Sequence, residues 1–102
     1  MVDSREKGKK GERELANRLR ELGIEDARRG QQFSGREEQD IVGLDGIYVE
    51  CKRVNKLNIN EAILKAIEDA GDKTPAVFHR RDRGEWLVTM RLDDWVEMYR
   101  ER

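Results

Sequence analysis

The sequence predicts an α/β fold, in which a mixed β-sheet is flanked by helices and the elements follow in the order α-β-β-β-α-β-β-α. Apolar residues that recur every three or four positions indicate helices. They alternate with short apolar runs, bounded by glycine or charged residues, that indicate strands. No linker, repeat or low-complexity tract divides the 102 residues. We therefore expect one domain spanning residues 1–102.

The first helix is expected from Arg5 to Leu22, with Gly23 ending it. Its apolar stripe consists of Leu15, Ala16, Leu19 and Leu22. Glu12 lies one turn before Leu15 and therefore near this stripe. A short strand around Asp26–Arg29 follows, and the polar, glycine-flanked stretch from Gly30 to Glu38 predicts a loop.

A β-hairpin is predicted next. Its strands are Asp40–Leu44 and Ile47–Arg53, and Asp45-Gly46 between them is a favoured two-residue hairpin turn. Because successive side chains of a strand point to opposite faces, Glu50 and Lys52 share one face while Val49 and Cys51 point the other way. The hairpin thus carries an acid on each strand and an amine beside one of them.

A second helix is expected over Ile59–Ala70, capped by Asn58 or Asn60 and ended by Gly71. Its apolar stripe consists of Ala62, Ile63, Ala66, Ile67 and Ala70. Small alanines permit close packing, so we interpret this stripe as core or dimer interface.

The remaining elements form a second hairpin and a last helix. Ala76–His79 and Glu85–Met90 are the predicted strands, and the turn at Asp82–Gly84 joins them. The last helix is expected over Asp93–Arg100. Its apolar residues Trp95, Val96 and Tyr99 are expected to cover the sheet, and Trp86 is likewise interpreted as a packing residue.

Asp40, Glu50 and Lys52 predict a metal-dependent site for phosphodiester hydrolysis. Two carboxylates on neighbouring strands suit one hard divalent cation such as Mg²⁺, which takes oxygen ligands. Lys52 beside them suits the tasks of orienting or deprotonating a water and offsetting charge that builds on the phosphate. A Glu-x-Lys pattern alone usually marks a solvated strand face with a weak ion pair. Its conjunction with Asp40 and with the helical Glu12 favours the catalytic interpretation.

These residues resemble a known family over nearly the whole chain. The segments Gly11-Glu12-Arg13-Glu14-Leu15, Asp40-Ile41-Val42 and Val49-Glu50-Cys51-Lys52 are similar to the PD-(D/E)XK nuclease superfamily. Within it, the likeness is to archaeal-type Holliday junction resolvases and their small phage-encoded relatives. The resemblance implies a restriction-endonuclease-like fold and a homodimeric endonuclease that cuts four-way DNA junctions with Mg²⁺, for which Mn²⁺ is expected to substitute.

The resemblance also implies a role for each matching residue. Asp40 and Glu50 would bind the metal, Lys52 would be the catalytic lysine, and Glu12 would complete the metal site from the helix. Arg13 and Arg29 match arginines that contact phosphate. Gln32 and Ser34 lie in the loop that would approach the DNA backbone. The chain departs from the superfamily pattern at Gln39, where proline is usual, and at Cys51, where a small aliphatic residue is usual.

Charge is distributed unevenly along the chain. The formal net charge is only −1, so no global positive field indicates a nucleic-acid partner. Basic residues nevertheless cluster at Arg28-Arg29 and at His79-Arg80-Arg81, with Arg83 close by. We interpret Arg28, Arg80 and Arg81 as further DNA-binding candidates. His79 is either structural or a phosphate contact.

Composition excludes several other classes. A single cysteine excludes an intramolecular disulfide and a cysteine-rich zinc site, and a single histidine excludes the two-histidine zinc protease motif. No phosphate-binding glycine loop followed by Lys-Ser or Lys-Thr is present, so no nucleotide cofactor is expected. No membrane-length apolar run or signal-peptide core occurs. We expect the reducing cytoplasm of a bacterial or phage-infected host cell.

Two other functions remain open on the sequence alone. One is a different nuclease of the same superfamily, acting on nicked, flapped or duplex DNA with the same catalytic residues. The other is a noncatalytic DNA-binding module that kept the fold. Retention of Glu12, Asp40, Glu50 and Lys52 argues against the second.

Overall fold

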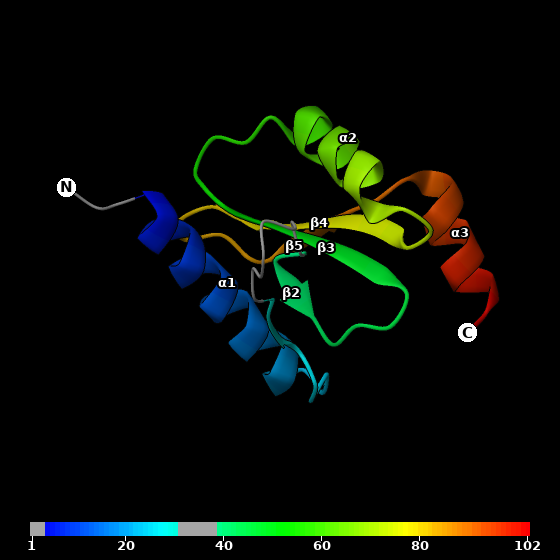
Figure 1. Cartoon of the computed structure of the whole chain (residues 1–102), viewed down its shortest axis with the longest axis horizontal. Coiled ribbons are helices and arrows are strands. Elements are labelled where there is room, and N and C mark those ends of the chain that lie inside the picture. The colour runs from blue at the N-terminus through cyan, green and yellow to red at the C-terminus, as the bar shows by residue number, and fades with distance from the viewer. Residues whose placement is uncertain (1–3, 31–38) are drawn as a thin grey trace.

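The computed structural model describes residues 4–30 and 39–102, and these ranges contain three helices and one five-stranded sheet (Figure 1). The order of the elements is the one expected from the sequence. The elements are α1 (Ser4–Glu21), β1 (Arg28–Arg29), β2 (Ile41–Val42), β3 (Ile47–Arg53), α2 (Ile59–Ala70), β4 (Thr74–Arg80), β5 (Leu87–Thr89) and α3 (Leu92–Arg100). Within these ranges, no helix is both long enough and apolar enough to cross a bilayer.

The sheet is mixed, and its strands lie in the order β1-β2-β3-β4-β5. β3 and β4 are parallel and pair along their whole length, from Ile47 opposite Thr74 to Arg53 opposite Arg80. All other neighbouring strands are antiparallel. The parallel pair requires a crossover, and α2 supplies it. By contrast, β2 pairs with β3 only near Ile41 and Val49, so the second half of β3 extends beyond β2.

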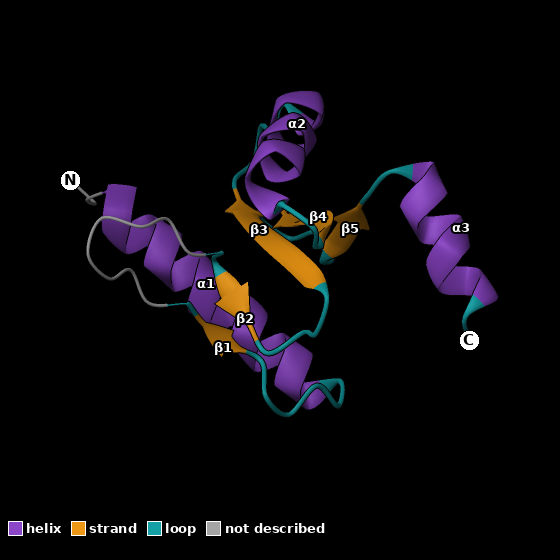
Figure 2. Ribbon diagram, turned by 45° about the vertical axis from the view of Figure 1, so that its right-hand side comes forward, coloured by secondary structure: helices purple, strands orange, loops and turns teal. Residues whose placement is uncertain are grey.

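Helices cover both faces of the sheet (Figure 2). The larger core cluster lies between α1 and one face, and its buried residues are Leu15, Ala16, Leu19, Ala27, Ile41, Val49, Ala76 and Phe78. The smaller cluster lies between α2 and the other face, and its buried residues are Tyr48, Ala62, Ala66, Ala70 and Val77. Neighbours in β3 thus face opposite helices, which confirms the alternation expected for this strand.

α2 begins and ends at the expected residues. Asn58 is its cap, with its side-chain oxygen accepting from the backbone N–H of Glu61 at 3.2 Å. Gly71 follows the helix with φ +62°, a conformation that favours glycine. Ala62, Ala66 and Ala70 face the sheet and are buried, so the helix approaches the strands closely.

The expectation for α3 is wrong in one respect. The helix forms at Leu92–Arg100, but none of its residues, all of which are described, is buried. Trp95 remains 51% exposed and stacks on Tyr99 with ring centroids 5.2 Å apart. Figure 2 shows α3 standing away from the sheet. An amphipathic pattern identifies residues that share a stripe, but the direction in which the chain leaves β5 decides whether the sheet is covered. Trp86, in contrast, packs against the larger core cluster as expected.

The first hairpin also differs from the expectation. Ile47 donates its N–H to the carbonyl of Leu44 at 3.1 Å, which closes a turn around Asp45-Gly46. The strand pairing, however, begins only at Ile41–Val42, so the connection is longer than a two-residue turn. Gly43 adopts φ +99°, and a Cβ there would lie 2.1 Å from the carbonyl oxygen of Asp26. Glycine at this position therefore permits the close approach of the two backbone segments.

Candidate active site

Glu50 and Lys52 share the face of β3 that is turned toward α2. Glu50 is the only polar or charged residue, among those described, that is buried, with 6% of the residue exposed. The Nζ atom of Lys52 lies 3.8 Å from Glu50 Oε1. A second ammonium group, Lys65 of α2, approaches the same oxygen to 3.9 Å. The sequence pattern predicts Glu50 and Lys52 as site residues, whereas no pattern in it singles out Lys65.

Asp40 reaches this site by binding the backbone of β3 beyond its short pairing with β2. Its Oδ2 accepts the backbone N–H of Cys51 at 2.8 Å. Next to it, Gln39 Oε1 accepts the backbone N–H of Val49 at 2.9 Å. These two side chains accept from backbone N–H groups of β3 beside the first residue of β2, and so satisfy donors that β2 does not pair. Gln39, which stands where the superfamily pattern has proline, therefore positions the strand that carries Glu50.

Burial raises the pKa of both carboxyl groups. Desolvation is the main cause for Asp40 and for Glu50, and the negative charge of Asp40 raises the pKa of Glu50 further. Lys52 and Lys65 act in the opposite direction on both groups. Two neighbouring, partly desolvated carboxylates stabilise any cation placed between them. Their oxygen donors fit the preference of Mg²⁺ or Mn²⁺.

Glu12 lies on α1, near Asp40. Arg29 Nε donates to Glu12 Oε1 at 3.1 Å. Burial is the main cause that raises the pKa of Glu12, and the charge of Asp40 contributes in the same direction. Within residues 4–30 and 39–102, no three histidine, cysteine, aspartate or glutamate side chains converge closely enough to hold one metal ion. Glu12 is thus an electrostatic neighbour of Asp40 that is paired with Arg29.

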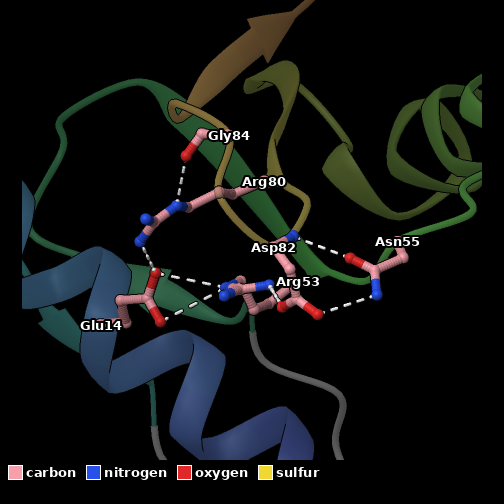
Figure 3. A network of polar contacts seen from close by, with 6 residues as sticks. All are labelled: Glu14, Arg53, Asn55, Arg80, Asp82 and Gly84. Atoms are coloured by element: carbon pink, nitrogen blue, oxygen red, sulfur yellow. Dashed lines mark hydrogen bonds and ion pairs between the residues drawn. The ribbon is translucent and has the colours of Figure 1, made fainter.

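Glu14, two residues after Glu12 on α1, belongs to a polar network on the α1 side of the sheet (Figure 3). Its carboxylate accepts from Arg53 Nε at 3.3 Å and also from Arg80. Arg80 donates in addition to the carbonyl of Gly84 at 2.6 Å. Arg53 extends the network to Asp82 at 2.8 Å. The guanidinium of Arg80, a candidate for DNA binding, is therefore engaged in joining α1 to β4.

The helix supports this network through a close approach to β3. A Cβ on Gly11 would lie 2.6 Å from the Cβ of Arg53, so a larger residue would displace the helix or the strand. Beside this contact lies a cavity of about 410 Å³ with a basic rim formed by Lys7, Lys10, Arg13 and Arg53. Lys7 and Lys10 were not singled out by sequence, although helical spacing places them near Arg13 or Glu14.

The other DNA-binding candidates are dispersed. Arg28 is exposed, and its Nη1 donates to the carbonyl of Asp26 at 3.1 Å. Arg81 is exposed at the end of β4, beside a second cavity that His79 also lines. Gln32 and Ser34 lie outside the described residues. The structure therefore brings Arg29 next to Glu12 but gathers no single cluster of all the candidate arginines within the described ranges.

His79 and Cys51 both have structural surroundings. His79 Nε2 makes a hydrogen bond of 2.9 Å with the hydroxyl of Thr89 on the adjacent strand. The side chain of Cys51 packs against the larger core cluster, on the face opposite Glu50. Burial raises the pKa of its thiol, which disfavours the reactive thiolate.

Comparison with known proteins identifies the family. A model of the archaeal Holliday junction resolvase (hjc) family matches residues 3–99. Searches of curated proteins and of solved structures returned no match. The matched range includes α1, Asp40 and the Glu50-Cys51-Lys52 segment, as well as all five strands. The chain belongs to the archaeal Holliday junction resolvase family.

Proposed function

We propose that this chain is a Mg²⁺-dependent endonuclease that hydrolyses phosphodiester bonds at four-way DNA junctions. Family membership supports the general class, a junction-resolving nuclease. The observation that carries the proposal is the convergence of Asp40, Glu50 and Lys52 at the point where β2 begins and β3 continues past it. Phosphodiester hydrolysis needs both a site for a hard cation and a neighbouring group that handles a proton or charge.

Each of these residues has a distinct task in the proposed reaction. Asp40 and Glu50 would hold Mg²⁺ or Mn²⁺, which when bound supplies a Lewis acid and lowers the pKa of a bound water. Lys52 donates hydrogen bonds that orient the attacking water or offset charge on the phosphate. Glu12 is proposed as the helical acid that completes the metal site. In the arrangement described, its pairing with Arg29 keeps it adjacent to Asp40.

DNA binding is proposed to rest on phosphate contacts around this site. Arg13 is exposed on α1, and with Lys7 and Lys10 it forms a basic rim beside Arg53. Arg28 and Arg81 are also exposed. Contacts to phosphates position a protein without reading bases, so recognition would depend on the shape of the junction.

We also propose that the protein works as a homodimer, because an isologous pair presents two equivalent sites to a two-fold symmetric junction. The surface that supports this proposal is α3 with the edge strand β5. A helix of nine residues is marginal in water without packing, yet the apolar stripe of α3 is uncovered. α3 has acids in its first turn, Asp93 and Asp94, and Arg100 in its last. An antiparallel second copy would therefore place opposite charges against each other.

Light scattering after size exclusion tests the dimer. The wild type is expected to have the mass of two chains, and Trp95→Asp is expected to have the mass of one. Leu64→Asp is the matched control, because Leu64 is 62% exposed and lies on α2, outside the proposed surface of α3 and β5. A monomeric wild type, or a Trp95→Asp variant that remains dimeric, contradicts the proposed interface.

Cleavage of a labelled, immobile four-way junction beside a matched linear duplex tests the activity. The reaction is run with Mg²⁺ or with EDTA, for wild type and for Asp40→Asn, Glu50→Gln and Lys52→Ala. We expect symmetric nicking of the junction by wild type with Mg²⁺ only, and no cutting by the three variants, which should still bind the junction. Lys73→Ala is the control for loss of one positive charge outside the site.

Each result separates the proposal from its alternatives. Cutting of junction and duplex alike would indicate a general nuclease with the same catalytic residues. Binding without cutting, with or without metal, would indicate a noncatalytic module. Cutting by the variants at the wild-type rate would show that the assigned site is wrong.

A further inference from the structure

Lys65 lies at the same carboxylate as Lys52 but comes from a different element. Its Nζ is 3.9 Å from Glu50 Oε1, against 3.8 Å for Lys52. Lys65 reaches across from α2 because Ala62 and Ala66 allow that helix to pack closely against the strand. The helical pattern places Lys65 on the polar side of the stripe, where a solvated lysine is the ordinary interpretation. Only the packing of α2 on β3 shows that Lys65 also lies beside Glu50.

Neither lysine forms a direct hydrogen bond with the carboxylate of Glu50. Direct hydrogen bonds between an ammonium group and a carboxylate measure about 2.7–2.9 Å, clearly shorter than both contacts. Each ammonium group therefore keeps donors for another acceptor. The side chain of Lys65 is 55% exposed, compared with 34% for Lys52 and 8% for Glu50. Lys65 thus lies between the buried carboxylate and solvent, where a substrate phosphate would enter.

Lys65 adds a second positive charge beside the two central acids, at nearly the same distance from Glu50 Oε1 as Lys52. The formal charges of Asp40, Glu50, Lys52 and Lys65 cancel. With a divalent cation held by the acids, the group carries a double positive charge. A phosphodiester that gains a second negative charge during hydrolysis is the matching ligand.

We propose that Lys65 is a further catalytic residue of this site, which binds a non-bridging oxygen of the scissile phosphate and stabilises its developing charge. The inference rests on the proposed nuclease function. Lys52 acts from the strand side of Glu50 and Lys65 from the helix side, so the two ammonium groups flank the position at which the phosphate meets the carboxylates. Removal of either ammonium group leaves the metal-loaded site with one positive charge, whereas the transition state carries two negative charges.

The test compares Lys65→Met, Lys65→Arg and the charge-matched control Lys73→Met. Lys73 lies between α2 and β4 and makes no side-chain ion pair to Glu50. Single-turnover cleavage of the junction with Mg²⁺ is expected to slow by about 100- to 1,000-fold in Lys65→Met. Lys65→Arg should recover part of the rate, and Lys73→Met should match wild type. Urea denaturation establishes that all variants are folded.

A second readout does not depend on cutting. Junction binding is measured in Ca²⁺ at several salt concentrations, and the slope of log K against log salt should decrease in magnitude by about 0.9 in Lys65→Met, as expected for one lost phosphate contact. If wild type cleaves and Lys65→Met retains both the rate and the slope, the role of Lys65 is overturned while the nuclease function stands. If wild type cuts no DNA with Mg²⁺ or Mn²⁺, both are overturned.

Discussion

The polar network around Glu14 makes a sharp prediction for stability. The carboxylate of Glu14 holds Arg53 of β3 and Arg80 of β4, and all three side chains are only 22–31% exposed. Replacing Glu14 with Gln keeps the shape of the side chain and removes its charge. Arg53 retains Asp82 at 2.8 Å, whereas Arg80 retains only the carbonyl of Gly84 among the contacts described. Most of the lost stability should therefore come from the contact between residue 14 and Arg80.

The magnitude follows from the burial of these groups. A hydrogen bond to a charged group contributes about 1.5–3 kcal/mol when it is buried, whereas an exposed ion pair contributes about 0–1 kcal/mol. The three side chains lie between these limits, so two weakened arginine contacts should cost about 2 kcal/mol in total. For a domain of this size, that loss lowers the melting temperature by about 10 °C.

Urea denaturation followed by circular dichroism measures the effect. The midpoint should fall in Glu14→Gln while the m-value stays unchanged, since the same surface is exposed on unfolding. Glu21→Gln is the matched control, because Glu21 pairs with Arg18 at 3.3 Å on the same helix but at 65% and 51% exposure. The free energy of unfolding of Glu21→Gln should differ from that of wild type by no more than about 0.5 kcal/mol. Equal losses in the two variants would refute the argument that burial gives the Glu14 network its strength.

Three further substitutions test single features of the fold. Asn58→Ala removes the cap of α2 and should destabilise the protein by about 1 kcal/mol in urea denaturation; an unchanged midpoint would show that the cap is dispensable. Arg83 adopts φ +62°, so in the same assay Arg83→Gly should be neutral or stabilising by up to about 1 kcal/mol, and a loss would argue against backbone strain. Burial lowers the pKa of His79 below 6.5, so stability present above that pH is lost as pH falls toward the folded-state pKa. His79→Gln should therefore lose less stability than wild type between about pH 7.5 and pH 5.5, and parallel losses would exclude this contribution.

Local physical rules were sufficient for several elements. β3 and α2 have the bounds that the sequence predicts, because apolar alternation and the cap at Asn58 act over only a few residues. The same alternation places Glu50 and Lys52 on one face of the strand, independently of how the strand packs. Strand ends that depend on a partner strand were predicted less accurately. β1 and β2 are shorter than expected because pairing, rather than composition, decides where a strand ends.

The sequence by itself determined the identity of the central acid and amine groups, Glu50 and Lys52, since their relation is a matter of two positions along one strand. Only the tertiary structure decided that Asp40 binds the backbone of Cys51 and that Lys65 approaches Glu50. It also decided that α3 leaves its apolar stripe uncovered. These relations join residues distant in sequence, and they depend on how far one element lies from another. A periodic pattern encodes which side chains share a face, but the element that packs against that face is chosen by the fold as a whole.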